Sequence, residues 1–147
     1  MTTYVTKDTE ETQELALKIA KDLKGGEVIF LFGDMGAGKT TFTQGLAKGL
    51  QISHRIVSPT FIIMRSYTIT KNSLLEAMNF YHIDLYRTKT EADIASAGVY
   101  DVLARPHTIS VVEWPEKIKK NIPQKRIEIR FKRISDGERE ITVQKYE

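Results

Sequence analysis

The stretch Gly33-Asp34-Met35-Gly36-Ala37-Gly38-Lys39-Thr40 decides the fold predicted for this chain. It satisfies the pattern G-x-x-x-x-G-K-[ST], a glycine-rich loop between a strand and a helix that cradles phosphate groups. Glycines allow successive backbone N–H groups to turn toward phosphate oxygens, and the following helix directs its positive end at the same point. We therefore expect nucleotide phosphates against the backbone of this loop, at Asp34, Gly36, Ala37 and Gly38.

Side chains at the end of the loop carry the more specific chemistry. Lys39 is expected to reach the β and γ phosphates as a compact charge, and Thr40 offers its hydroxyl to magnesium. Thr41 is expected to help hold the α phosphate. The chain has no Asn-Lys-x-Asp segment of the kind that selects guanine, and Thr88-Lys89-Thr90-Glu91 comes nearest. Adenine is therefore favoured, and ATP with Mg²⁺ is the predicted ligand.

The elements on either side of the loop follow in the order that it requires. Residues 27–32 form a continuous apolar run rich in β-forming residues, which is typical of a strand covered on both faces. After the loop, Phe42, Leu46 and Leu50 recur at four-residue spacing and predict a helix from Lys39 to Leu50. A strand therefore leads into the loop and a helix leads out of it.

The remaining segments predict the rest of the fold. Asp8 is a candidate N-cap for a helix that stops before Gly25-Gly26, and Asp136-Gly137 marks the turn of a hairpin. The other predicted elements are extended segments at 61–69, 78–85 and 108–112, a helical region at 91–103, and alternating strands at 126–134 and 139–146. This order predicts an α/β protein, a three-layer P-loop NTPase fold with a mixed central sheet and a C-terminal antiparallel hairpin, in a single domain over residues 1–147.

Two carboxylates are expected to complete a phosphate site. Asp84 follows the apolar residues of one predicted strand and Glu113 follows those of another, and open α/β sheets place ligands at such strand ends. One carboxylate would hold magnesium or its waters, and the other would orient or deprotonate an attacking water. The sequence does not assign the two roles.

Composition excludes several classes of function. The chain of 147 residues contains no cysteine, so disulfides and thiolate metal sites are excluded. The three histidines, His54, His82 and His107, lack ligand spacing, so we expect them to be exposed or hydrogen-bonded within the fold, with no structural metal. No run approaches the roughly 20 apolar residues of a membrane span, and the N-terminus lacks a signal region, so we expect a cytoplasmic protein without membrane contact.

Positive charge gathers in one part of the chain, although the net charge is only +3. Of the seventeen residues from Lys117 to Arg133, eight are Lys or Arg and only Glu128 is acidic. Such a segment forms either a shallow positive patch for nucleic acid or a solvated face.

Four segments together resemble one known family. They are Gly33–Thr41, Ser58-Pro59-Thr60-Phe61, His82-Ile83-Asp84-Leu85-Tyr86-Arg87 and Val112-Glu113-Trp114-Pro115. In this order they are similar to the TsaE (YjeE) family, ATPases needed for threonylcarbamoyladenosine modification of bacterial tRNA, over about residues 8 to 145. The first segment is shared by many families, whereas the other three are far more selective.

The resemblance implies roles for individual residues. Lys39 and Thr40 would serve ATP and magnesium, Glu113 would help Thr40 hold the ion, and Asp84 would support hydrolysis. Trp114 would be a functional position, although a packed core aromatic is its alternative, and Thr60 would line the phosphate side as a switch-like residue. Arg87 would be either a cation near the reacting phosphate or an ion-pair partner of Asp84. Thr9 and Gly137 would lie near the adenosine.

The resemblance also implies partners and leaves alternatives open. A TsaE family ATPase would act with the TsaD–TsaB complex at adenosine 37 of tRNA, turning over slowly alone, and would not transfer the threonylcarbamoyl group itself. The basic segment could contact tRNA within that complex. A small-molecule or nucleotide kinase and a non-catalytic ATP-binding scaffold are the alternative functions.

Overall fold

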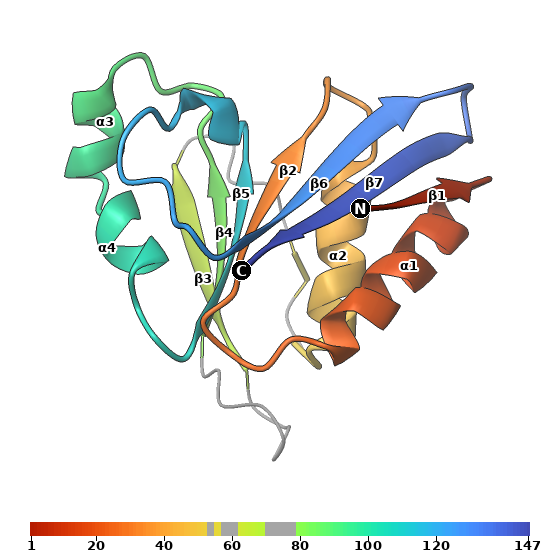
Figure 1. Ribbon diagram of the computed structural model, residues 1–147, viewed down its shortest axis with the longest axis horizontal. Coiled ribbons are helices and arrows are strands. Elements are labelled where there is room, and N and C mark those ends of the chain that lie inside the picture. The colour runs from red at the N-terminus through yellow and green to blue at the C-terminus, as the bar shows by residue number, and fades with distance from the viewer. Residues whose placement is uncertain (53–54, 57–61, 70–78) are drawn as a thin grey trace.

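The computed structural model describes residues 1–52, 55–56, 62–69 and 79–147, and these form a sheet covered by helices on both faces (Figure 1). Its strands are β1 (Thr2–Thr6), β2 (Val28–Phe32), β3 (Met64–Thr68), β4 (Asn79–Asp84), β5 (Thr108–Glu113), β6 (Arg126–Arg133) and β7 (Arg139–Tyr146). Its helices are α1 (Thr9–Lys21), α2 (Lys39–Gly49), α3 (Glu91–Ser96), α4 (Val99–Leu103) and the 3₁₀ turn η1 (Pro115–Lys117). Among these residues the sheet has seven strands, in the order β1-β7-β6-β2-β5-β4-β3.

The sheet is mixed, as the sequence predicts. Strand β2 pairs in parallel with both β5 and β6, and β4 pairs in parallel with β5. Strands β3, β7 and β1 add antiparallel pairs toward the two edges. The C-terminal hairpin of β6 and β7 is confirmed, but β6 is an interior strand beside β2, and only β7 and β1 extend outward from it.

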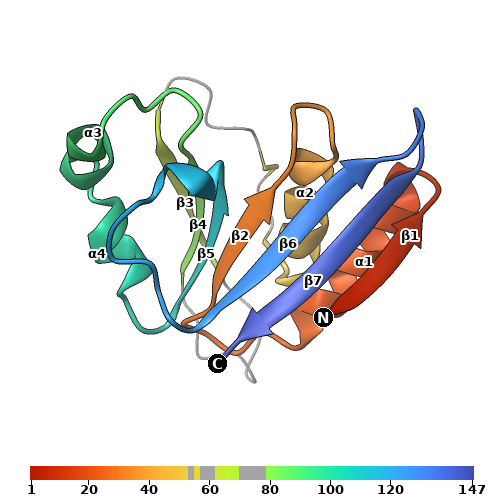
Figure 2. The ribbon, with the colours of Figure 1, turned by 45° about the horizontal axis from the view of Figure 1, so that its top comes forward.

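Strand β2 divides two hydrophobic cores because successive side chains of a strand point to opposite faces. Ile29 and Leu31 pack in the core beneath α1 and α2, whereas Val28 and Phe30 pack in the core beneath α3 and α4. Figure 2 shows α1 and α2 side by side on one face of the sheet, with α3 and α4 on the other. The continuous apolar run of β2 is thus explained by burial on both faces, which confirms the three-layer arrangement.

Helix α1 begins where the sequence predicts. The Asp8 side chain accepts a hydrogen bond from the Glu11 backbone N–H at 2.8 Å, and the Glu11 carboxylate accepts one from the Lys7 N–H at 2.9 Å. The first bond satisfies one of the N–H groups that a helix start leaves without partners, and the second holds the residue just before the N-cap. The helix ends at Lys21, shortly before Gly25 and Gly26.

Two features differ from the prediction. The region 91–103 is not continuous, because Gly98 adopts a left-handed conformation with φ of 82° and separates α3 from α4. Strand β1 was not predicted, since four of its five residues are exposed and the alternation that identifies a half-buried strand is missing. It forms because β7 presents a free edge with which Thr2–Thr6 can pair.

Other predicted segments lie partly outside the described residues. The extended segment predicted from residue 61 is seen as β3, which pairs antiparallel with β4 as expected, while Phe61 and the motif that contains it are not described. No helix among the described residues is both long and apolar enough to cross a membrane.

Close packing of α1 against α2 depends on small side chains. A Cβ atom on Gly45 would lie 2.7 Å from both the Ala16 Cβ and the Gln13 carbonyl oxygen, and one on Gly49 would lie 2.6 Å from the Ala20 Cβ. Contacts below 3.0 Å require the helices to separate, which moves the helix that begins at the glycine loop.

Substituting Gly45 with alanine should therefore destabilise the protein, although alanine is the better helix former by about 1 kcal/mol. We expect a loss of about 1–3 kcal/mol in the free energy of unfolding, measured by chemical denaturation, because the added methyl overpacks the interface. The control is Lys48→Ala, an exposed position of the same helix, which should stay within about 0.5 kcal/mol of the unmodified chain. A Gly45→Ala protein as stable as the control would contradict this explanation.

Candidate functional site

The glycine loop joins the end of β2 to the start of α2 and has a backbone that few other residues could adopt. Gly38, the N-cap of α2, has φ of 104°, in the left-handed region that favours glycine. A Cβ on Gly33 would lie 3.1 Å from both the Cβ and the carbonyl oxygen of Phe131 on β6. The loop is thereby held against the neighbouring strand while the N-terminus of α2 faces outward.

Lys39 is buried at the centre of this loop, with only 5% of the residue exposed. Its Nζ donates a hydrogen bond to the Gly33 carbonyl at 2.6 Å and lies 4.0 Å from the centre of the Trp114 ring. Burial lowers the pKa of Lys39, and the negative charge of Glu113 offsets part of that effect. A cation removed from water in this way favours an anionic ligand.

Asp84 and Glu113 converge because their strands are in register. They are paired positions of the parallel strands β4 and β5, and Glu113 is in turn the partner of Leu31 near the end of β2. In a parallel pair, registered side chains point to the same face, so both carboxylates lie on the face that carries α2. The sequence-based expectation that two strand ends meet beside the loop agrees with this geometry.

The two carboxylates have different surroundings. The Asp84 carboxylate accepts a hydrogen bond from the Tyr86 backbone N–H at 2.9 Å. Burial raises the pKa of Asp84, and the nearby Glu113 charge raises it further. Glu113 is buried, and its carboxylate lies 2.6 Å from Nε2 of the fully buried His82.

These side chains line one cavity of about 470 Å³. Of the predicted site residues, the cavity wall includes Gly36, Gly38, Lys39, Thr40, Thr41, Asp84, Glu113 and Trp114, and Arg87 lines it too. Asp34, Ala37, Thr9 and Gly137 are not part of the wall, and Thr60 lies outside the described residues. Gly137 does lie near the start of α1, since a Cβ there would be 2.7 Å from the Lys7 carbonyl oxygen.

Trp114 has a strained backbone and a ring that borders the cavity. Its φ of 59° is left-handed, an uncommon conformation for a bulky residue. The ring packs against Tyr86 in a tilted arrangement, with 5.1 Å between ring centres and 46° between ring planes, and the Lys39 ammonium lies over it. Trp114 both borders the cavity and packs against the core beneath α3 and α4, so its functional role stays a prediction beside the packed-aromatic alternative.

The donor set suits magnesium bound together with phosphates. Among the described residues no cluster of three or more His, Cys, Asp or Glu forms a metal cage. Magnesium instead commonly uses one or two carboxylates, phosphate oxygens and water. A hydroxyl from Thr40 and the Glu113 carboxylate, both in the cavity wall, fit that pattern.

Comparison with known proteins agrees with the motifs. The family model described as "Threonylcarbamoyl adenosine biosynthesis protein TsaE" matches residues 6–141. The chain belongs to the TsaE family. The resemblance drawn from four short segments is thereby confirmed over most of the chain.

Relatives and a solved structure support the same assignment. A tRNA threonylcarbamoyladenosine biosynthesis protein TsaE from Bacillus subtilis is 39% identical over 137 residues, covering 93% of this chain and 81% of the relative. One from Treponema pallidum is 32% identical over 139 residues, covering 95% and 97%. The crystal structure of Bacillus subtilis YdiB has a TM-score of 0.74 at 36% identity, covering 99% of this chain and 86% of that one.

For two polar residues at the site of this TsaE family protein, the sequence assigned no role. His82 lies two positions before Asp84, so strand alternation places it on the same face and provided a signal. Its Nε2 makes a hydrogen bond within the fold, as expected, whereas its Nδ1 is buried with no partner among the described residues. Arg139 also lines the cavity, but it follows a hairpin turn whose position beside the loop no local pattern indicates.

The raised pKa of Asp84 has a consequence for stability. A carboxyl group with a higher pKa in the folded than in the unfolded state favours folding only when protonated, and this benefit is lost as pH rises from the ordinary value of 3.8 through the folded pKa. The ionised Asp84 therefore destabilises the ligand-free protein at neutral pH. Asp84→Asn should raise the free energy of unfolding at pH 7, by no more than about 1 kcal/mol because solvent screens a half-buried charge.

The gain in the free energy of unfolding should disappear below about pH 3, where the Asp84 carboxyl is protonated and residue 84 is neutral in both proteins. Asp93→Asn is the matched control with the opposite sign, since backbone N–H groups of Lys89 and Thr90 lower the pKa of Asp93, so that its ionised form stabilises the fold. Denaturant unfolding at several pH values measures both variants. An Asp84→Asn protein that is less stable than the unmodified chain at pH 7 would contradict the assigned electrostatics.

Proposed function

We propose that this TsaE family protein is a magnesium-dependent ATPase that serves threonylcarbamoyladenosine modification of tRNA in the cytoplasm. It would act with the TsaD–TsaB complex at adenosine 37 and would not perform the transfer itself. The observation that carries the proposal is the convergence of Lys39, Thr40, Asp84 and Glu113 on one cavity at the glycine loop. These are the groups that phosphoryl transfer to water requires.

Each residue has a distinct proposed role. Lys39 binds the β and γ phosphates with the ammonium donors that its hydrogen bond to the Gly33 carbonyl leaves available. Thr40 and Glu113 hold magnesium, which when bound neutralises charge on the phosphate oxygens. Glu113 is suited to this because its carboxylate is fixed by His82, whereas Asp84 is half-buried with a raised pKa and is better suited to orient or deprotonate water.

The rim of the cavity supports a role for a partner protein. Met35, Ile62 and Tyr86 line the cavity while 69%, 49% and 45% exposed. A protein that covers these apolar side chains would exclude water and strengthen the electrostatic interactions inside. We therefore propose that hydrolysis is slow in the isolated protein and is changed when TsaD and TsaB bind.

The basic segment supports direct tRNA contact less strongly than its composition indicates. Arg126 and Arg130 both pair with the buried Glu128, at 2.8 and 2.9 Å. Lys117 donates to the backbone carbonyls of Tyr86 and Thr88. These cations are engaged within the fold, and Arg133 likewise pairs with Asp136. Any contact with tRNA would therefore rest on the remaining lysines.

Substitution of individual residues separates binding from hydrolysis. Lys39→Ala should abolish detectable ATP binding, measured by isothermal titration calorimetry with magnesium present, because a buried charge on the phosphates is lost. Asp84→Asn should bind ATP with nearly unchanged affinity and release phosphate at least about 100-fold more slowly, since general base assistance contributes factors of about 100 to 10,000. Lys48→Ala, exposed on α2 outside the cavity wall, is the control and should match the unmodified chain.

The same assays address the other functions. Phosphate release is measured with and without purified TsaD and TsaB, and modified tRNA is measured in a strain that lacks its own family member. Transfer of the γ phosphate to an acceptor other than water would indicate a kinase. Restoration of modified tRNA by both the Asp84→Asn and Glu113→Gln variants would indicate an ATP-binding scaffold, and no restoration by the unmodified chain would contradict the proposal.

A further inference from the structure

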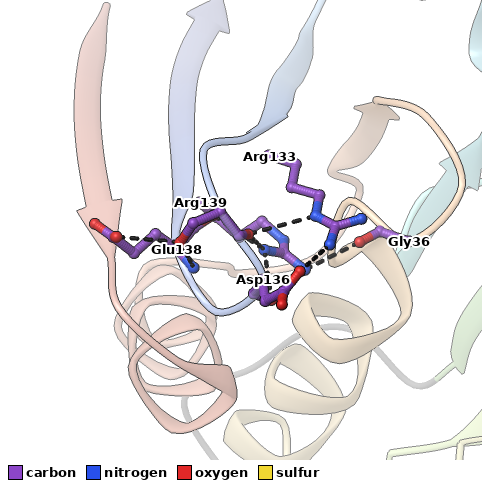
Figure 3. Close-up of polar contacts among 6 residues, drawn as sticks. Gly36, Arg133, Asp136, Glu138 and Arg139 are labelled. Carbon is purple, nitrogen blue, oxygen red and sulfur yellow. Dashed lines mark hydrogen bonds and ion pairs between the residues drawn. The ribbon is translucent and has the colours of Figure 1, made fainter.

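One arginine connects the β6–β7 turn to the glycine loop, as Figure 3 shows. On one side of the Arg139 guanidinium, Nε donates to the Ala37 carbonyl and Nη2 to the Gly36 carbonyl, both at 3.1 Å. On the other side, Nη1 lies 2.8, 3.1 and 3.0 Å from the carbonyl oxygens of Ser135, Asp136 and Glu138. All five acceptors are backbone carbonyls, two in the glycine loop and three in the β6–β7 turn. The side chain therefore joins the two loops through their backbones.

The carbonyls that Arg139 holds determine where loop N–H groups point. A trans peptide is planar, so its C=O and N–H point in opposite directions. The peptide that joins Ala37 to Gly38 has its carbonyl fixed by Arg139, and its N–H, on Gly38, therefore points to the opposite side. Gly38 lines the cavity, so the arginine orients a donor of the phosphate-binding nest without occupying the nest.

The charge of Arg139 is not neutralised by a nearby acid. Within the described ranges, no carboxylate lies within 4.0 Å of its guanidinium, whereas Arg133 on the same hairpin pairs with Asp136. Arg139 is partly buried and, like Lys39, lines the cavity. A guanidinium that engages only carbonyl dipoles leaves positive potential at the cavity, which favours a polyanion there.

The turn from which Arg139 projects is itself fixed. The hydroxyl of Ser135 lies 3.1 Å from the Glu138 carboxylate, and Ile134 donates its backbone N–H to the Glu138 carbonyl. Gly137 packs so closely on the Lys7 carbonyl that no side chain would fit. The turn therefore provides a stable base from which the arginine can hold the loop.

We propose that Arg139 is a positioning residue that makes the β6–β7 turn a structural part of the phosphate-binding loop. It holds the Gly36 and Ala37 carbonyls on the outer side of the loop and keeps the nest ready for a polyphosphate. This inference rests on the proposed function of the cavity as an ATP site. It predicts that substituting Arg139 weakens phosphate binding, while the rate of the chemical step, which depends on Asp84 and Glu113, stays nearly unchanged.

The test compares two substitutions at Arg139 with a substitution of an exposed cation on the same hairpin. Arg139→Gln removes the charge, and Arg139→Lys keeps the charge but cannot hold two carbonyls in a planar fork. Lys132→Gln is the control, because Lys132 is an exposed cation on the same hairpin and does not line the cavity. Two probes are used with magnesium: ATP, and inorganic tripolyphosphate, which has no adenosine and reports on the phosphate loop alone.

Both Arg139 variants should bind ATP and tripolyphosphate about 10- to 100-fold more weakly, by the same factor for the two ligands, with saturated phosphate release within about threefold of normal. Hydrogen exchange in residues 33–40 should be faster in the ligand-free Arg139 variants, and Lys132→Gln should change neither the affinities nor this exchange. Arg139 variants that bind both ligands as tightly as the unmodified chain would overturn the inference. A loss of affinity confined to ATP, or an Arg139→Lys variant with the affinity of the unmodified chain, would also overturn it. If the unmodified chain binds neither ATP nor tripolyphosphate, the proposed function itself fails.

If the Arg139 variants do not fold, a second measurement tests the inference on the unmodified chain. Adding magnesium tripolyphosphate should slow hydrogen exchange in the turn at residues 134–139 as well as in the loop, because Arg139 links the two. Protection confined to the loop would overturn the inference.

Discussion

The parallel alignment of β2, β4 and β5 is the constraint on which the site depends. Their carboxyl ends meet at one edge of the sheet, and the pairing of Asp84 with Glu113 and of Glu113 with Leu31 sets how close the acidic side chains lie to the glycine loop. A shift of one residue in either pairing would turn a carboxylate to the opposite face. The two hydrophobic cores, on opposite faces of β2, hold this register and therefore hold the site.

The register that brings these side chains together also makes the charges of the ligand-free site unfavourable. Lys39 is buried and its pKa is lowered, while Asp84 lies near Glu113 and its pKa is raised. Each charge would gain from a further partner of opposite sign, because neighbouring charges within the protein offset only part of the effect of burial. In the proposed function, magnesium provides positive charge for the carboxylates and ATP provides negative charge for Lys39. This explains why residues that weaken the isolated fold are useful in the complex.

Local sequence pattern predicted the parts of this structure that depend on neighbours in the chain. The apolar run at 28–32, the Asp8 cap and the turn at Asp136-Gly137 each have a signal within a few residues. Strand β1 was missed because its pairing is decided by an edge of β7 far along the chain. The link from Arg139 to Ala37 spans 102 positions and depends on where β6 joins the sheet, which no local pattern specifies. His82 is an intermediate case. Strand alternation predicts the face of the sheet on which it lies, but its contact with Glu113 depends on the β4–β5 register, which the sequence does not show.

The central claim is that the cavity binds MgATP with Thr40 and Glu113 on the metal. The most direct measurement is a crystal structure of the protein with magnesium and a non-hydrolysable ATP analogue. The account predicts the polyphosphate against residues 36–41, the Lys39 ammonium on its β and γ oxygens, and a magnesium ion about 2.1 Å from the Thr40 hydroxyl, with Glu113 bound to it directly or through water. A polyphosphate bound elsewhere, or a metal held without Thr40, would contradict it.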